Sequence, residues 1–520
     1  MRGGLLATRQ VVSRISRRRF LYGAGASLAA WPVLVGTQTS DDGRRVFRHG
    51  VASGDPLADR VILWTRATPS AGSGGDPLSV RWRIADDERL TRLVAQGTAM
   101  ARRDRDFTVN VDAAGLRPGA SYYYAFDAGG EQSPVGRTRT LPARGAARLR
   151  LAIVSCSDFE KGYFNAYRNI AARQDLDAVL FLGDYIYEYS TTTPGIQRAA
   201  GRVPAPAHEC VSLDDYRQRY ASHHLDADLA ALHATHPTIA VWDDHESAND
   251  AWRGGAPRHE AEQGLWSARK AAARQAFDEW LPLRESPRMY RQFGFGGLAD
   301  VMMLDGRSYR DQQVLASDYL ALTDPKRSML GAEQEAWLYD QLRRSSRNGT
   351  AWRLLGQQVI FAPFVPQVGS ALEIDNWEGY PAARGRFFDC VERDRIPDVA
   401  VLTGDIHSSW ALDLPRSPLS GYDETTGHGS LAVEIITPAV TSPPFFSRAG
   451  SRERARTFHS ASPHMRYMDG DRHGYVTLDI TREKLLAEWY HVRTIAERTS
   501  DEVKAASFVC ERGSARLQRT

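Results

Sequence analysis

The chain has 520 residues, which is long enough for two or three domains around a large hydrophobic core. Hydrophobic residues make up 42% of the sequence and charged residues 25%, a composition typical of a folded protein and not of a disordered one. The net charge of +3 arises in residues 1–40, which hold six arginines and no acidic residue. Because the remaining chain is not basic and has no long lysine or arginine run, we expect no nucleic-acid-binding patch.

Residues 1–40 have the pattern of an export signal. Arg17 and Arg18 precede an apolar run from Leu21 to about Val35, which is too short to span a bilayer comfortably. The arginine pair resembles a twin-arginine signal. We therefore expect recognition by the twin-arginine export machinery and a secreted, periplasmic or cell-envelope location. A basic membrane anchor or an irregular tail is the alternative.

Residues 44–142 are predicted to form a small all-β domain. Val61–Arg66 and Leu78–Ile84 are rich in β-branched and aromatic residues, and Phe107–Val111 alternates between apolar and polar side chains. Glycine- and proline-rich turns separate these runs. Leu116–Tyr124 resembles the turn into a late strand of fibronectin-type sandwiches. The pattern therefore indicates a fibronectin- or immunoglobulin-like β-sandwich of roughly 100 residues.

Residues 148–495 are predicted to form an α/β (α+β) domain, because short apolar runs alternate there with helix-like stretches. The strand candidates are Leu149–Val154, Ala178–Leu182, Thr238–Trp242, Val301–Leu304, Trp352–Phe361 and Val399–Leu402, and the best helix candidates are Ala261–Leu281 and Ala332–Arg344. Residues 496–520 are charged and weakly patterned, so we expect a C-terminal tail.

Four of the predicted strands end in groups that can bind a metal ion. Leu149–Val154 leads to Cys156, Ala178–Leu182 to Asp184 and Tyr187, Thr238–Trp242 to Asp244 and His245, and Val399–Leu402 to Asp405 and His407. Ligands of open α/β sheets bind beyond the carboxyl ends of the strands, so four such ends on one sheet would bring these side chains together. Each motif alone has an ordinary explanation, such as a capping turn or a small buried thiol. Their coincidence at four strand ends favours a site.

The donor types suggest which ions the site would hold. A phenolate such as Tyr187 favours a ferric ion, and the thiolate of Cys156 would add a second anionic donor. Asp244 and Asp405 supply oxygen, which suits calcium. Asp184 directly follows its strand and suits a carboxylate shared between metals. This mixture differs from the histidine and cysteine sets of zinc sites.

The motifs resemble those of the PhoD-like alkaline phosphatases, metallophosphoesterases related to purple acid phosphatases. In that family Ser-Cys, Gly-Asp-x-x-Tyr, Trp-Asp-Asp-His-Glu and Gly-Asp-x-His occur in the order found here. Further similar motifs are Gly50-Val51-Ala52-Ser53-Gly54-Asp55-Pro56, Leu304-Asp305-x-Arg307-x-Tyr309-Arg310-Asp311, Trp377-x-Gly379-Tyr380-Pro381 and Ile436-Thr437-Pro438-x-Val440-Thr441-Ser442-Pro443. The resemblance covers roughly residues 44–495.

The resemblance implies a metallophosphoesterase-like β-sandwich core flanked by helices, following the small all-β domain. It also implies hydrolysis of phosphate mono- and diesters by hydroxide that Fe³⁺ and Ca²⁺ make available. Carried over by position, Cys156, Asp184, Tyr187 and His407 would hold Fe³⁺, and Asp184, Asp244 and Asp405 would hold Ca²⁺. The three-residue step from Asp184 selects Tyr187 over Tyr185 and Tyr189.

Two further residues receive catalytic roles from the same motifs. His245 would contact the substrate phosphate or the leaving oxygen. Arg307 would bind phosphate oxygens in a bidentate manner, or alternatively form a salt bridge with Asp305 or Asp311. A ligand thiolate cannot also be in a disulfide, so we expect Cys156 to be unpaired and any disulfide to join two of Cys210, Cys390 and Cys510.

Two other functions compete with this interpretation. A phospholipase D-like enzyme would use the same metals on phospholipid headgroups and would differ in loops near the site, at Thr191–Ala207 and Thr441–Arg456. A non-catalytic protein that binds cell-wall polymer is the second alternative, although ligands present at all six metal positions argue against a decayed site. The alternatives thus add membrane lipids and cell-wall polymers to the candidate substrates.

Overall fold

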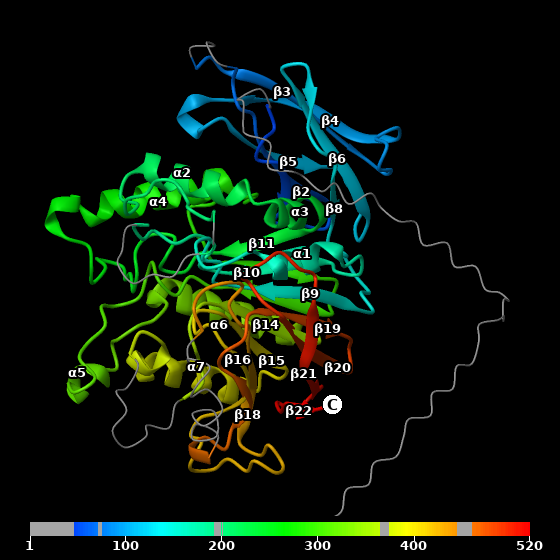
Figure 1. Cartoon of the computed structure of the whole chain (residues 1–520). Coiled ribbons are helices and arrows are strands. Elements are labelled where there is room, and N and C mark those ends of the chain that lie inside the picture. The colour runs from blue at the N-terminus through cyan, green and yellow to red at the C-terminus, as the bar shows by residue number, and fades with distance from the viewer. Residues whose placement is uncertain (1–45, 71–74, 192–198, 200, 364–373, 445–459) are drawn as a thin grey trace, which may run out of the picture. The chain divides into compact units, whose positions relative to one another are not determined.

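The computed structural model describes residues 46–70, 75–191, 199, 201–363, 374–444 and 460–520 (Figure 1). The predicted export signal and parts of the two predicted substrate loops, at 192–198, 200 and 445–456, lie outside these residues. No helix in the described part of the chain has the length and apolar character that a membrane crossing requires.

The larger of the two central sheets has ten strands in the order β22-β21-β20-β19-β9-β10-β11-β1-β2-β5. Its middle strands are parallel, and they are β9 (Leu149–Val154), β10 (Ala178–Leu182) and β11 (Pro237–Val241). Every side chain of β10 and β11 is buried, which explains why these strands read as unbroken apolar runs. The other strands are β1 (Val51–Gly54), β2 (Arg60–Arg66), β5 (Thr108–Ala114), β19 (Gly474–Ile480), β20 (Lys484–Val492), β21 (Glu502–Glu511) and β22 (Gln518–Arg519).

The second central sheet has seven strands in the order β12-β13-β14-β15-β17-β16-β18. Side chains of β14 (Trp352–Gln357) alternate between two cores: Leu354 packs with residues of β9 and β10, and Leu355 packs with helices on the other side. The two central sheets therefore pack face to face. The remaining strands are β12 (Arg291–Phe295), β13 (Ala299–Met303), β15 (Val399–Thr403), β16 (Ser409–Pro415), β17 (Ser430–Ile436) and β18 (Met465–Asp469).

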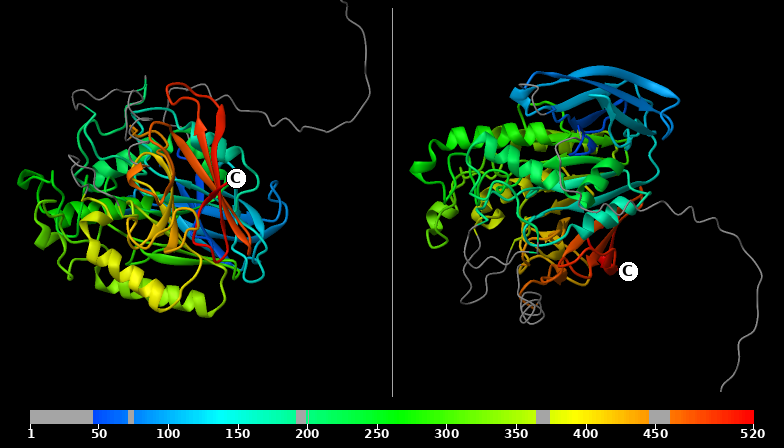
Figure 2. Two further views of the ribbon diagram at one scale, coloured as in Figure 1. Left: turned by 90° about the horizontal axis from the view of Figure 1, so that it is seen from below. Right: turned by 45° about the horizontal axis from the view of Figure 1, so that its top comes forward.

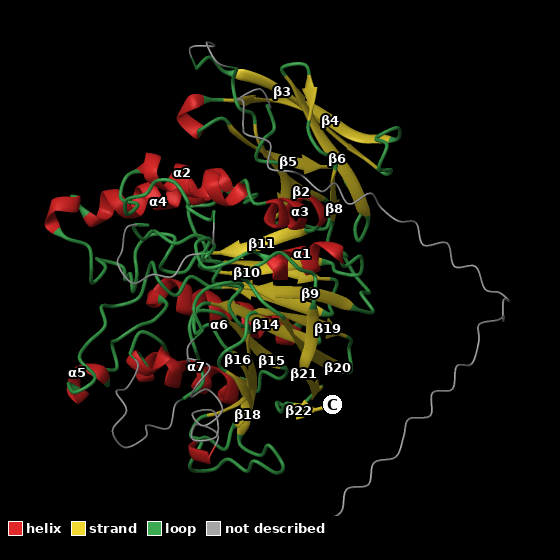
Figure 3. Ribbon diagram, viewed as in Figure 1, coloured by secondary structure: helices red, strands yellow, loops and turns green. Residues whose placement is uncertain are grey.

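Helices cover the outer faces of the two packed sheets (Figures 2 and 3). Side chains of α1 (Asn165–Ala172), α2 (Leu213–His224), α3 (Ala227–Thr235) and α4 (Trp266–Trp280) join the core of the ten-stranded sheet. Those of α6 (Gly331–Arg347) and α7 (Pro381–Arg393) pack on the seven-stranded sheet. The short helices are α5 (Tyr319–Leu322), η1 (Arg103–Arg105), η2 (Ala261–Gln263) and η3 (Trp377–Gly379). Within the described residues, the result is a two-sheet sandwich between helical layers.

The N-terminal region is all-β, as predicted, but it is not a separate sandwich. Its five-stranded sheet packs against β1, β2 and β5, which are themselves the edge of the ten-stranded sheet. The N-terminal strands connect to the rest of the ten-stranded sheet where β1 pairs in parallel with β11, with Ser53 opposite Pro237. The strands of the five-stranded sheet are β3 (Leu78–Ala85), β4 (Leu93–Ala101), β6 (Ser121–Ala128), β7 (Glu131–Gln132) and β8 (Gly136–Arg139).

Two predictions about the fold need correction. The four strands that lead to the site do not share one sheet, because β15 belongs to the seven-stranded sheet. The end of β15 nevertheless lies against the end of β9 across the sandwich. Gly404, directly after β15, is so close to Ser155, directly after β9, that an added Cβ would lie 2.8 Å from Cβ of Ser155. The predicted tail is also structured. Ala506, Phe508 and Cys510 alternate inward along β21, which pairs with β20 at the edge of the larger sheet.

Candidate metal centre

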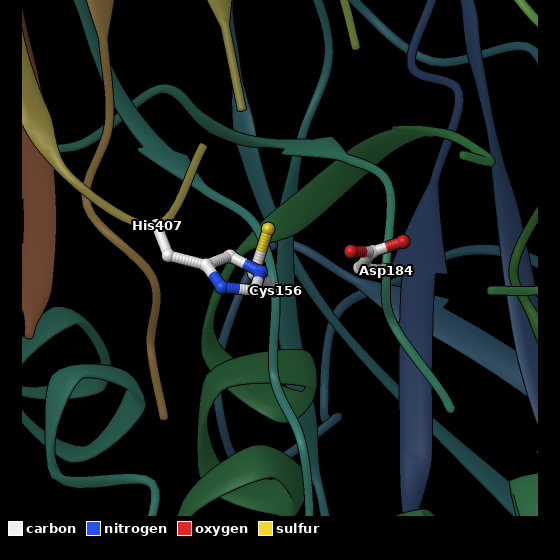
Figure 4. Close-up of side chains that lie close together, drawn as sticks. All are labelled: Cys156, Asp184 and His407. Carbon is white, nitrogen blue, oxygen red and sulfur yellow. The ribbon is translucent and has the colours of Figure 1, made fainter. Parts of the chain in front are cut away.

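The carboxyl ends of β9, β10, β11 and β15 bring the predicted metal ligands together. Cys156, Asp184 and His407 offer ligand atoms that all lie within 4.8 Å of one another (Figure 4). The Tyr187 hydroxyl lies 2.9 Å from Oδ2 of Asp184 and 3.3 Å from Nε2 of His407. These four residues, expected to hold iron, therefore form one cluster.

A second and a third cluster adjoin the first. The ligand atoms also lie within 4.8 Å of one another in the group of Asp184, Asp244 and His245. The same holds for the group of Asp243, Asp244 and Asp405. Asp184 belongs to both the first and the second cluster, which is the geometry expected of a carboxylate shared between two metals. All six predicted ligands thus lie in one continuous region.

The backbone is strained at four of these ligands. Cys156, Asp184, Asp405 and His407 have φ values of 60°, 53°, 62° and 55°, in the left-handed region that L-residues rarely adopt. Such conformations cost about 1–3 kcal/mol each and cluster at functional sites. Gly183 has a φ of 103°, and a Cβ there would lie 2.3 Å from Cβ of Asp243, so only glycine permits the β10 and β11 ends to approach this closely.

Buried carboxylate oxygens in these clusters lack hydrogen-bond partners. Among the described residues, Oδ1 of Asp184 and Oδ2 of Asp243 have none, and neither does Oδ1 of Asp244, although it lies 3.4 Å from Nη2 of Arg307. An unpaired buried carboxylate is costly, and native structures satisfy such groups with a counter-charge or a metal ion. The donor set therefore fits bound cations.

Burial and mutual repulsion perturb the ionisable groups here. Burial raises the pKa of Asp184 well above its usual range, and the carboxylates of Asp243 and Asp244 add to the rise. Burial also raises the pKa of Asp243 to about 6. For Asp244, Arg307 and His245 outweigh burial and hold its pKa below the usual range. Burial lowers the pKa of His407 to about 4, so its imidazole is neutral and able to bind a metal. A cation would relieve the repulsion among the carboxylates.

Family models match both parts of the chain. The model of the PhoD-like phosphatases matches residues 151–489, and the model of the N-terminal domain of PhoD-like phosphatases matches residues 34–142. The chain belongs to the PhoD-like phosphatase family. Alkaline phosphatase D of Bacillus subtilis (strain 168) is 35% identical over 536 residues, covering 97% of this chain and 89% of that protein. A solved structure of PhoD superposes with a TM-score of 0.81 at 34% identity, covering 91% of this chain and 92% of the other. This PhoD-like protein is therefore an enzyme, a phosphoesterase.

His245 of this phosphatase is held by a carboxylate that the sequence analysis missed. Oε2 of Glu188 lies 2.7 Å from Nδ1 of His245, and both side chains are buried. Burial lowers the pKa of His245, but Glu188, Asp184 and Asp244 outweigh it, so the net shift is upward. Because Nδ1 contacts Glu188, Nε2 is the nitrogen left for a second partner. The only hint in the sequence was that Glu188 follows Tyr187 directly.

The guanidinium of Arg307 forms salt bridges, but not with Asp305 or Asp311 as the alternative prediction had it. Its buried guanidinium pairs with Asp243, with Asp375 at 2.5 Å, with Asp405 at 3.1 Å and with Asp244 at 3.4 Å. Asp305 accepts the backbone N–H of Arg307 at 3.1 Å and is not among these partners of the guanidinium. Arg307 is thus the counter-ion of the carboxylate clusters, and its three guanidinium nitrogens already face carboxylates. The predicted contact of Arg307 with phosphate stays a prediction.

Glu246 joins two of the ligand-bearing turns. Its fully buried carboxylate accepts the backbone N–H groups of Asp184 at 3.2 Å, Tyr185 at 2.6 Å and Asp243 at 2.7 Å. It therefore fixes the end of β10 against the end of β11. Glu246 is the last residue of the Trp-Asp-Asp-His-Glu motif, but the sequence does not indicate these three hydrogen bonds.

The structure agrees with the expectation about Cys156 and shows a cavity beside the clusters. Cys156 is unpaired, as predicted, and Cys210, Cys390 and Cys510 are unpaired as well. A cavity of about 360 Å³ opens beside the clusters and is lined by Tyr187, His245 and His407, together with Phe159, Lys161, Tyr189, Asn249 and Pro443 among others. The cavity gives a substrate access to His245.

Proposed function

We propose that this phosphatase is an exported metallophosphoesterase that hydrolyses phosphate mono- and diesters at a site for Fe³⁺ and Ca²⁺. Fe³⁺ would be held by Cys156, Asp184, Tyr187 and His407, and Ca²⁺ by Asp184, Asp244 and Asp405. The sandwich of two sheets between helical layers is consistent with a metallophosphoesterase-like core. The PhoD-like family membership supports the reaction class.

The observation that carries this proposal is the convergence of anionic donors on Asp184. Asp184 shares one cluster with the thiol of Cys156, the phenol of Tyr187 and the imidazole of His407, and another with Asp244 and His245. A phenolate is a hard anionic donor that suits a ferric ion, a thiolate adds a second anionic donor, and carboxylate oxygens suit calcium. Arg307 alone cannot balance Asp184, Asp243, Asp244 and Asp405, so positive charge is still required there.

Each protein group has a separate task in the reaction. When bound, the cations would offset the charge of the phosphate group and make hydroxide available near neutral pH. Glu188 holds Nδ1 of His245, so that Nε2 can donate a proton to the leaving oxygen. Arg307 holds the carboxylates of Asp244 and Asp405 in place. Glu246 keeps the two ligand turns at a fixed separation.

A substrate panel tests this function. The purified enzyme, supplied with iron and calcium, should hydrolyse a chromogenic phosphate monoester and a diester, and should act on phosphatidylcholine vesicles much more slowly. Faster release of choline than of either chromophore would instead indicate the phospholipase D-like alternative. A protein that binds both metals and cleaves none of the three would support the non-catalytic, wall-binding alternative.

Export by the twin-arginine route is part of the proposal, because this route carries folded proteins that have already bound their metals. Replacing Arg17 and Arg18 by lysine keeps the charge of the leader but removes the paired arginines. We expect the precursor to stay inside the cell, which fractionation and immunoblotting would measure. Unchanged export of this double variant would disprove the route.

A further inference from the structure

The segment that follows β17, Thr437–Pro443, has no role in the proposed mechanism, although its motif was conspicuous in the sequence. Thr437, Thr441 and Ser442 are fully buried in spite of their hydroxyl groups. Buried hydroxyls need hydrogen-bond partners, so the contacts of this segment show what it holds.

Most of these contacts reach the turn that carries Cys156. Val440 donates its backbone N–H to Ser155 O at 3.0 Å, and the N–H groups of Thr441 and Ser442 both donate to Cys156 O at 3.2 Å. The Ser442 hydroxyl also donates to Cys156 O, at 2.9 Å. One carbonyl thus accepts three hydrogen bonds from the segment, which fixes Cys156 in its left-handed conformation.

Two more contacts reach the other ligands of the first cluster. The Ser442 hydroxyl lies 2.6 Å from the Tyr187 phenol oxygen, so its single proton is shared between this oxygen and Cys156 O. Nδ1 of His407 lies 2.8 Å from the carbonyl oxygen of Pro443. Because that carbonyl can only accept, Nδ1 carries the proton and Nε2 is left with its lone pair facing Tyr187 and Cys156.

One short segment therefore contacts three of the four residues proposed to hold iron, Cys156 through its backbone carbonyl and Tyr187 and His407 through their side chains. Among the described residues, none of its hydrogen bonds reaches Asp244 or Asp405, the residues proposed for calcium alone. The segment is thus specific to one half of the site. Partners behind metal ligands orient those ligands and tune their electron density, and losing one such partner typically costs about 10–100-fold in metal affinity or activity.

We propose that Ser442 is the positioning residue of the iron half of the site, since its single hydroxyl links the Cys156 carbonyl to the Tyr187 oxygen. The inference rests on the proposed function, in which Tyr187 binds iron. Hydrogen bonding to Ser442 draws electron density from the phenol oxygen, so it should tune the iron-bound phenolate as well as orient it.

Ser442→Ala tests the inference in the full-length holoenzyme. We expect the affinity for iron to fall about 10–100-fold, as measured by competition with a chelator, and the bound calcium to stay unchanged in elemental analysis. Without the hydrogen bond the phenolate is richer in electrons, so less energy moves an electron to the metal. The visible band of the iron-loaded variant should therefore shift to longer wavelength.

Two variants separate positioning from packing. Thr441→Val removes an equally buried neighbouring hydroxyl, which donates to Asp158 O at 2.7 Å and contacts no proposed ligand. It should keep the iron affinity and the band of the wild type. Ser442→Thr retains the hydroxyl and should keep the band position, which allows the test to proceed even if Ser442→Ala does not fold.

The outcomes distinguish this inference from the proposed function. A wild-type band and iron affinity in Ser442→Ala would overturn the inference while leaving the iron site intact. Equal loss of iron in Ser442→Ala and Thr441→Val would overturn it as well, because the effect would then be general packing. A wild-type enzyme that binds iron without a visible band would overturn the phenolate assignment, and the role of Ser442 with it.

Discussion

Asp405→Asn should lower turnover on the order of a hundredfold or more, and the purified variant should contain less calcium than the wild type. The substitution hardly changes the size of the side chain, but it replaces one anionic oxygen with an amide nitrogen that cannot bind a cation. Asp405 also lies 3.1 Å from Nη2 of Arg307, so the variant removes one carboxylate that this guanidinium holds. Steady-state kinetics and elemental analysis measure the two effects.

Asp413→Asn is a matched control for this prediction. Asp413 is a fully buried carboxylate in β16 of the same sheet, where it accepts hydrogen bonds from the Tyr422 hydroxyl and the Leu517 backbone N–H, each at 2.8 Å. It contacts no proposed ligand, so its amide variant should keep calcium. A calcium chelator should abolish the activity of the wild type, and added Ca²⁺ should restore it. Full activity in excess chelator would refute the calcium assignment.

The sequence predicted individual elements better than their arrangement. The bounds of β9 and β10 match the expected ones, because a buried parallel strand reads as an unbroken apolar run. The division of the strands between two sheets could not be read from these runs, since an apolar run does not identify its neighbour. The short alternation of Ala506, Phe508 and Cys510 in β21 lies among charged residues, so the sequence pattern predicts a tail there and not a strand.

The same distinction applies to the site. Cys156, Asp184 and Asp405 could be identified because each follows a strand within two residues, and strand ends converge whichever sheet they belong to. Partners from distant loops left no such signal. Asp375, which pairs with Arg307, lies 68 residues from it along the chain, and Ser442 lies 255 residues from Tyr187. Only the folded structure brings such pairs into contact.

Tyr187→Phe should remove the visible band of the iron-loaded enzyme and most of its turnover, while the protein still folds. The ring of Tyr187 packs on His245 with centroids 4.2 Å apart, and phenylalanine retains this contact. The Ser442 hydroxyl keeps Cys156 O as an acceptor, so no buried donor is left unpaired. What the variant loses is the oxygen that lies 2.9 Å from Oδ2 of Asp184. Visible spectroscopy, elemental analysis and kinetics of the same sample measure the result.

The neighbouring tyrosines supply the controls, because the structure turns their hydroxyls elsewhere. The Tyr185 hydroxyl lies 3.1 Å from Nε2 of His224 and 2.8 Å from Nε2 of His233, and the Tyr189 hydroxyl donates to Oδ1 of Asn249 at 2.6 Å. Neither oxygen is placed to bind the metal held by Asp184, so Tyr185→Phe and Tyr189→Phe should keep the band. If Tyr187 were only a core aromatic, its phenylalanine variant would keep both colour and turnover. An unchanged spectrum in iron-loaded Tyr187→Phe would therefore remove Tyr187 from the site and leave the ferric assignment without its phenolate.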